Sequence, residues 1–130
     1  MSLMEREAAV NARRALVEAV ALFAAPADAQ VAWLSSLGTR PSADELALEF
    51  DDWYQLLGQM EALGLVSASA VSSSDALSQA LAELPEGGWD ESALARHPMW
   101  AQIRHFAGLA LVELVRSSPE PRATYVRAAS

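Results

Sequence analysis

The segment 98-PMWAQIRHFAGLALVELVR-116 constrains the fold of this chain more than any other stretch of the sequence. Its residues fit an α-helix on which the polar side chains Gln102, His105, Glu113 and Arg116 occupy one narrow strip. Almost every other position on this helix is apolar, and a helix that is apolar on most sides is usually covered by other helices. We therefore predict that 98–116 is the central helix of a bundle.

The remaining apolar residues also recur at intervals of three and four, which indicates helices and leaves no convincing strand. Pro26, Gly38 and Gly64 stand where such segments stop. The fold class that we predict is all-α, a bundle of about five helices in which the first and third pack along the last. Their expected ranges are 4–24, 27–37, 43–63, a fourth helix that begins at 68 or 75 and ends at 84, and 98–116, with a short turn of helix at 90–96.

Length and composition indicate one domain. The chain has 130 residues, of which 52 % are hydrophobic, so it can bury a core without cross-links. It has no cysteine, which excludes disulfides, thiolate metal sites and cysteine nucleophiles. We assign residues 4–116 to the domain, interpret 1–3 as an expression-vector remnant before Met4, and expect a frayed tail at 117–130.

The charges are unevenly distributed along the chain. The net charge is −8, all nine basic residues are arginine, and residues 41–95 hold eleven acids and no base. Such a chain is poorly suited to binding nucleic acid, which needs clustered basic residues. The longest apolar run, 106–115, is too short to cross a membrane. We therefore expect a cytoplasmic protein, and the lysine-free composition is typical of GC-rich bacteria.

The densest group of acids lies in 42-SADELALEFDDW-53. Ser42 and Glu45 have the spacing of a capping box at the start of a helix, and Asp44 lies where the helix dipole favours negative charge. Those roles explain two of the five acids and leave Glu49, Asp51 and Asp52 for other purposes.

A structural role is one interpretation of the acids that remain. Arg13 and Arg104 each fall on the apolar side of a predicted helix, and a buried charge without a partner is costly. Glu49 and Asp52 border the core stripe of their own helix. They could therefore turn inward and form ion pairs with these two arginines.

A docking role is the second interpretation. Glu49, Asp51 and Asp52 would then face water and contact a basic partner. Trp33 could be an exposed aromatic anchor at such an interface, or it could cover an end of the bundle. The absence of any basic residue between 41 and 95 favours this interpretation, because most protein surfaces mix both signs of charge.

A metal site is the third interpretation. Glu45, Glu49 and Asp52 share one side of the predicted helix, and their oxygens could bind Mg²⁺ or Mn²⁺, as in all-α hydrolases. Against it, such sites usually take carboxylates from two helices, and Glu113 is the only acid in 98–116.

The side chains that serve catalysis elsewhere are scarce in this sequence. His97 precedes Pro98 and is expected to be an N-cap or a loop residue, and His105 lies too far from it along a helix to share a metal. We expect Trp53 and Trp100 in the core, and Trp89 covering an end of the bundle.

The function that we predict is therefore that of a small non-catalytic helical interaction module. Its acidic segment 41–95 would dock a basic protein partner, as an immunity protein or an adaptor does, or the chain would associate with itself. No cofactor is implied, and neither nucleic acid nor membrane is an expected partner. The alternative is a divalent-metal-dependent all-α hydrolase that uses Glu45, Glu49 and Asp52.

Overall fold

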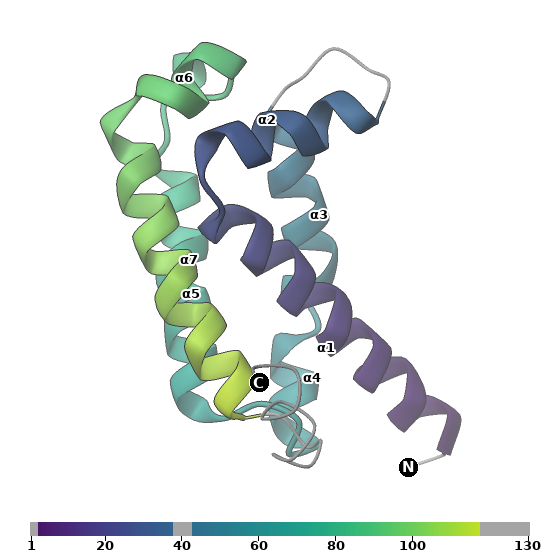
Figure 1. Cartoon of the computed structure of the whole chain (residues 1–130). Helices are drawn as coiled ribbons and strands as arrows, with labels where there is room; N and C mark the ends of the chain where they lie inside the picture. The colour runs from purple at the N-terminus through teal and green to yellow at the C-terminus, as the bar shows by residue number, and fades with distance from the viewer. Residues whose placement is uncertain (1–2, 38–42, 118–130) are drawn as a thin grey trace, which may run out of the picture.

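The computed structural model describes residues 3–37 and 43–117, apart from the side chain of Glu91. All regular structure within these ranges is helical, and the helices form one bundle (Figure 1), which confirms the predicted all-α fold. The elements are α1 (Leu3–Ala24), α2 (Ala27–Ser36), α3 (Asp44–Tyr54), α4 (Leu57–Ala62), α5 (Ala68–Ala82), the 3₁₀ helix η1 (Glu86–Gly88), α6 (Glu91–Arg96) and α7 (Pro98–Arg116).

Helix α7 packs most extensively along α1 and α5 (Figure 1), while α3 packs against α1. The prediction that the third helix lies along α7 is therefore wrong, because α5 takes that place. Two long neighbours do not enclose a helix, so one side of α7 stays open. Leu109 and Val112 on that side are 49 % and 47 % exposed.

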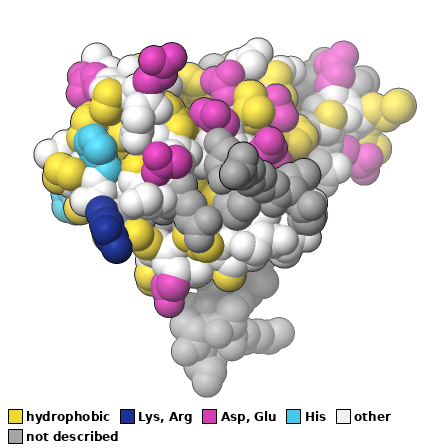
Figure 2. Space-filling model, turned by 90° about the horizontal axis from the view of Figure 1, so that it is seen from above, with side chains coloured by type: hydrophobic (Ala, Val, Ile, Leu, Met, Phe, Trp, Pro, Cys, Tyr) yellow, Lys and Arg dark blue, Asp and Glu magenta, His cyan; other side chains and the backbone are white. Residues whose placement is uncertain are grey.

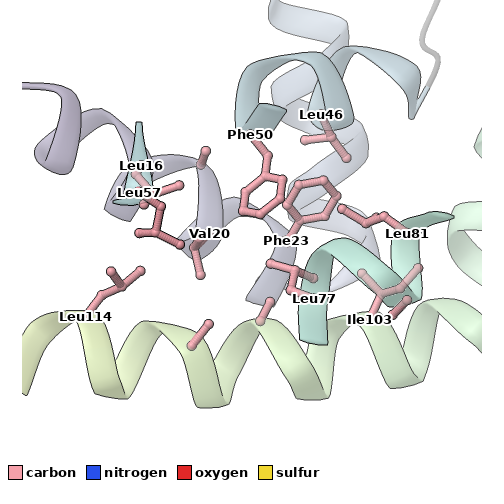
Figure 3. Packing of buried hydrophobic residues seen from close by; sticks show 14 of the residues in the cluster. Leu16, Val20, Phe23, Leu46, Phe50, Leu57, Leu77, Leu81, Ile103 and Leu114 are labelled. Atoms are coloured by element: carbon pink, nitrogen blue, oxygen red, sulfur yellow. The ribbon is translucent and has the colours of Figure 1, made fainter. Parts of the chain in front are cut away.

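The core is built around large side chains from α1, α3, α5 and α7 (Figure 3). At its centre Phe23 meets Phe50 edge to face, with ring centroids 5.9 Å apart, and stacks on Trp100 at 6.1 Å. Each large apolar side chain buried in this way stabilises the fold by about 1.5–3 kcal/mol. The prediction that Trp100 belongs to the core is confirmed, whereas Trp53 is only half-buried.

The predicted third helix, 43–63, is in fact two helices. A turn at Gln55 and Leu56 separates them, and helical backbone angles are lost at Leu56, two residues before Gly58, where a bend was expected. Helix α4 then ends in a Schellman motif, in which the amide of Gly64 donates to Glu61 O and that of Leu65 donates to Met60 O, both at 2.9 Å. Gly64 adopts a φ of 73°, which glycine tolerates better than other residues.

Side-chain caps mark the starts of several helices. Ser67 Oγ accepts from the amide of Ala70 at 3.1 Å, so α5 begins at Ala68 rather than at the alternative start, residue 75. His97 Nδ1 accepts from the amide of Met99 at 3.2 Å, so of its two predicted roles, N-cap and loop residue, the cap of α7 is confirmed. The predicted capping box rests on Ser42, which lies outside the described residues.

Candidate docking groove

A groove of about 520 Å³ runs between α3 and α5 on the surface of the bundle. Its floor is mainly apolar, and the carboxylates of Asp44 and Asp51 lie at its edge along α3. Trp89, directly after η1, lines it as well. The described residues that line it are Asp44, Ala47, Leu48, Phe50, Asp51, Ser78, Leu81, Ala82 and Trp89.

The geometry of α3 divides its side chains between core, groove and solvent. Phe50 and Leu46 face the core and are almost fully buried. Leu48 and Asp51 point to the groove side, and Leu48 is 59 % exposed. Because residues three and four apart share a helix face, this side of α3 combines an acid with an apolar surface.

Aromatic contacts from the core support the floor of the groove. The Phe50 ring stacks on Tyr54 with centroids 5.2 Å apart, and Trp89 meets Trp100 edge to face at 6.2 Å. The indole Nε1 of Trp100 donates to Gly88 O at 2.8 Å, and the amide of Ala43 donates to Trp89 O at 2.9 Å. Trp89 thus lines the groove, and its contact with Trp100 and the backbone bond from Ala43 hold it there.

A hydrogen bond joins the two walls one turn beyond Asp51. The phenol Oη of Tyr54 on α3 donates to Oδ1 of Asp75 on α5. This bond to a carboxylate, together with burial, raises the pKa of Tyr54 above its ordinary value. The protonated phenol acts as a clasp between α3 and α5.

The surroundings of the groove are acidic. No basic residue occurs between 41 and 95, the segment that supplies the described residues of the groove lining. Seen from the end where α2 and α6 lie, acidic side chains are spread among hydrophobic ones, and basic side chains appear only near one edge (Figure 2). A groove with charges of one sign attracts ligands of the opposite sign and accelerates their association.

The docking residues predicted from sequence are only partly brought together. Asp51 lines the groove, whereas Glu49 and Asp52 are exposed and do not line it. Trp33 is half-buried on α2, packs against the core, and also lies outside the groove lining. Sequence reasoning missed Leu48, although its position off the apolar stripe of α3 was a signal of an exposed hydrophobic residue.

The structure corrects the predicted ion pair of Arg13. This side chain is only 5 % exposed, as its place on the apolar face indicated, but its partners are backbone carbonyls. Its Nε donates to Leu65 O at 3.2 Å, and its Nη2 donates to Leu114 O at 2.6 Å. Leu114 lies in the last turn of α7, where carbonyls lack helical partners and carry the negative end of the helix dipole.

Arg104 also has partners other than Glu49 and Asp52. Its Nε and Nη2 donate to Oε1 of Gln30 at 3.2 and 3.0 Å, and Nη2 donates to Leu94 O as well. Partial burial lowers its pKa from the ordinary value. Gln30 is fully buried, and its Nε2 donates to the carbonyls of Leu22 and Phe23 at the end of α1. One glutamine thus links α1, α2 and α7, a role that sequence reasoning missed.

The arrangement of side chains does not favour the metal-site alternative. Glu45, Glu49 and Asp52 are exposed on α3. In the part of the chain that the structure describes, no group of three or more His, Asp or Glu side chains is placed to hold a metal ion. Glu113 of α7, the acid considered as a second source of ligands, forms an ion pair with Arg116 at 3.4 Å.

Comparison of the chain with protein-family models, with curated proteins and with solved structures found no match. Within residues 3–37 and 43–117, no helix is long and apolar enough to cross a membrane.

Proposed function

We propose that this protein is a non-catalytic, cytoplasmic interaction module whose groove between α3 and α5 binds a basic segment of a protein partner. One observation carries the proposal: an apolar groove with a carboxylate edge lies in a segment of 55 residues without a single basic side chain. Apolar contacts would supply most of the affinity, while the acids would attract and orient the partner.

The chemistry of the groove indicates what the partner presents. An aliphatic or aromatic side chain fits against Leu81 and Trp89, and arginine or lysine beside it reaches Asp44 and Asp51. The volume of about 520 Å³ lies within the range of small binding sites and accommodates a few side chains of such a segment. Neutralisation of a basic toxin by an immunity protein, or recruitment of a basic protein by an adaptor, would use this chemistry.

The direct test uses two labelled amphipathic peptides that share a leucine face and differ in the charged residues beside it. One carries arginine and the other carries glutamate. Fluorescence anisotropy is expected to show binding of the arginine peptide, weakened by added salt because the carboxylates are exposed. If neither peptide binds, or if both bind equally, the proposal is wrong.

Two variants with the same change of charge show where the peptide binds. Asp51→Asn removes a carboxylate at the groove, and Asp52→Asn removes the next carboxylate on the same helix, outside the groove lining. Exposed charge pairs contribute about 0.2–1 kcal/mol, so Asp51→Asn should weaken binding up to about five-fold. Asp52→Asn should have a smaller effect. Equal effects of the two variants would indicate attraction to overall charge and would exclude the groove.

A further inference from the structure

The chain itself contains a segment that matches the ligand proposed for the groove. Residues 118–130 lie outside the described ranges, and their sequence is SPEPRATYVRAAS. Beyond Glu120 this stretch has no acidic side chain, and it places Tyr125 and Val126 between Arg122 and Arg127. An apolar pair flanked by arginines is complementary to a groove with an apolar floor and a carboxylate edge.

The charges of this segment and of the groove are opposite. Residues 121–130 contain two arginines and no acid, whereas the segment 41–95, which supplies the described groove lining, contains eleven acids and no base. Arg13 and Arg104 are bonded to acceptors inside the bundle, so they do not compete for the groove. Electrostatic attraction therefore favours the approach of residues 121–130 to the groove.

The segment starts near the helix that forms one wall of the groove. Helices α5 and α7 lie side by side (Figure 1), and the hydroxyls of Ser117 and Ser67 are hydrogen-bonded at 3.0 Å where α7 ends and α5 begins. Ser78 and Leu81 of the groove lining follow Ser67 along α5. At 1.5 Å per residue, they lie about 17 and about 21 Å from it along the helix axis.

The chain is long enough to cover this distance. Each residue adds at most about 3.3–3.6 Å, so Tyr125 can lie up to about 26–29 Å from Ser117. Tyr125 can therefore reach Leu81 with several ångströms to spare for its path around the surface.

The order of the side chains along the segment also fits the groove. The bond from Tyr54 to Asp75 places Asp51, one turn earlier on α3, at the end of the groove nearer to the start of α5. A chain that arrives from that end brings Arg122 beside Asp51 before Tyr125 meets the apolar floor.

We propose that residues 121–127 bind in the groove of their own molecule and compete there with external basic partners. This inference rests on the proposed function, because the same chemistry selects both ligands. A short tether gives an effective concentration in the millimolar range, so a segment with a dissociation constant of about 1 mM as a free peptide would occupy the groove about half of the time. Half occupancy weakens the apparent affinity for an external partner about two-fold.

Disulfide cross-linking in the full chain tests the contact, because the chain has no cysteine of its own. Ala128→Cys keeps the side chains of residues 121–127, and Ala82→Cys places the second thiol in the groove lining. The control pairs Ala128→Cys with Ala101→Cys on α7, since Ala82 and Ala101 are both exposed. They lie about 22 Å from Ser67 and about 24 Å from Ser117 along their helices, so both are within reach. During mild oxidation, the Ala82 pair should form its intramolecular disulfide several-fold faster than the Ala101 pair.

Two carboxylate variants show whether the groove edge holds the segment. Asp51→Asn should slow oxidation of the Ala82 pair more than Asp52→Asn does, because only Asp51 lines the groove. Equal oxidation rates for the Ala82 and Ala101 pairs, or disulfides formed only between molecules, would overturn the inference. Neither result would bear on the proposed function, because no external peptide is present in this experiment.

Binding of the labelled arginine peptide shows whether the internal contact regulates the groove. Replacing Tyr125 and Val126 together by serine removes the apolar pair without a change of charge, and should tighten peptide binding about two-fold. Replacing Ala123 and Ala128 by serine is the control and should leave the affinity unchanged.

The outcomes separate this inference from the proposed function. If the peptide binds the Tyr125→Ser, Val126→Ser variant no more tightly than the wild type, the internal contact is overturned while the proposed function stands. If the Ala82 pair cross-links selectively but the peptide binds no variant, the internal contact is supported and an external basic partner is refuted.

Discussion

Replacing Arg13 by methionine tests the least expected structural feature of this bundle. The guanidinium is buried and bonded to two backbone carbonyls, one after α4 and one in the last turn of α7. Methionine keeps a long apolar side chain in the same space but cannot donate a hydrogen bond. The substitution therefore removes both bonds with little change in packed volume.

The expected loss of stability in Arg13→Met follows from the two backbone carbonyls that the substitution leaves without a donor. Leu65 and Leu114 are fully buried, so water has little access to the carbonyl oxygens that Arg13 satisfies. A buried polar group that loses its partner costs about 1–3 kcal/mol, and two such losses suggest about 2–6 kcal/mol. Part of this cost is offset because the variant no longer buries a charge. We expect the free energy of unfolding to fall by about 3 kcal/mol.

Urea denaturation followed by circular dichroism measures this change directly, and a fall of that size should lower the melting temperature by about 10 °C. Arg6→Met is the control, because Arg6 is exposed on the same helix and its replacement should change the free energy of unfolding by under about 0.5 kcal/mol. A change of similar size in both variants, or a loss below about 0.5 kcal/mol in Arg13→Met, would refute the argument. The buried carbonyls would then have found other partners.

Three further predictions follow from contacts around the groove and the helix ends. Arg104→Met should lower the free energy of unfolding, measured by urea denaturation, by about 1–3 kcal/mol, because Gln30 Oε1 on α2 and Leu94 O on α6 lose their donor. An unchanged free energy of unfolding would contradict this prediction. Gly88→Ala should lower the free energy of unfolding by about 1–3 kcal/mol, because its new Cβ would lie 2.7 Å from Leu84 Cγ. Gly87→Ala is the control and should cost almost nothing, since a Cβ there would meet no atom within 4 Å. Equal losses of stability in the two variants would refute the steric argument. Tyr54→Phe should be less stable than wild type near pH 8. Hydrogen bonding to Asp75 raises the pKa of Tyr54 in the folded state above the unfolded-state pKa of about 10. The extra stability of the wild type over Tyr54→Phe should therefore be complete below about pH 10 and be lost as the pH rises through the folded-state pKa. Equal stability of the wild type and Tyr54→Phe near pH 8 would show that this clasp contributes nothing.

Sequence and structure agree on most helix boundaries for local reasons. Pro26 and Pro98 cannot continue a preceding helix, and Gly64 readily adopts the positive φ that ends α4. His97 also caps α7 with its own side chain, as its place before Pro98 indicated. These signals lie within a few residues of the boundaries that they set. They can therefore be interpreted without knowing the rest of the fold.

The candidate groove could be predicted only in part. The sequence shows that its segment is acidic and that Asp51 stands apart from Glu49 and Asp52 on α3. It does not show that α5 lies beside α3 or that Trp89 lines the space between them. Which helices become neighbours depends on how all the apolar faces are covered at once. The pattern of one helix carries little information about that arrangement.

The spacing of apolar residues is sufficient to predict an all-α bundle, the approximate bounds of its helices and the inward position of Arg13. The groups that bind this arginine and the side of α7 that remains uncovered become visible only when the helices are packed together. The physical reason is the same in both cases. A buried guanidinium can bind any carboxylate or free carbonyl brought within reach, and an apolar helix face is covered only where a neighbour lies against it. Both outcomes depend on groups distant in the chain, such as Leu65 and Leu114 around Arg13.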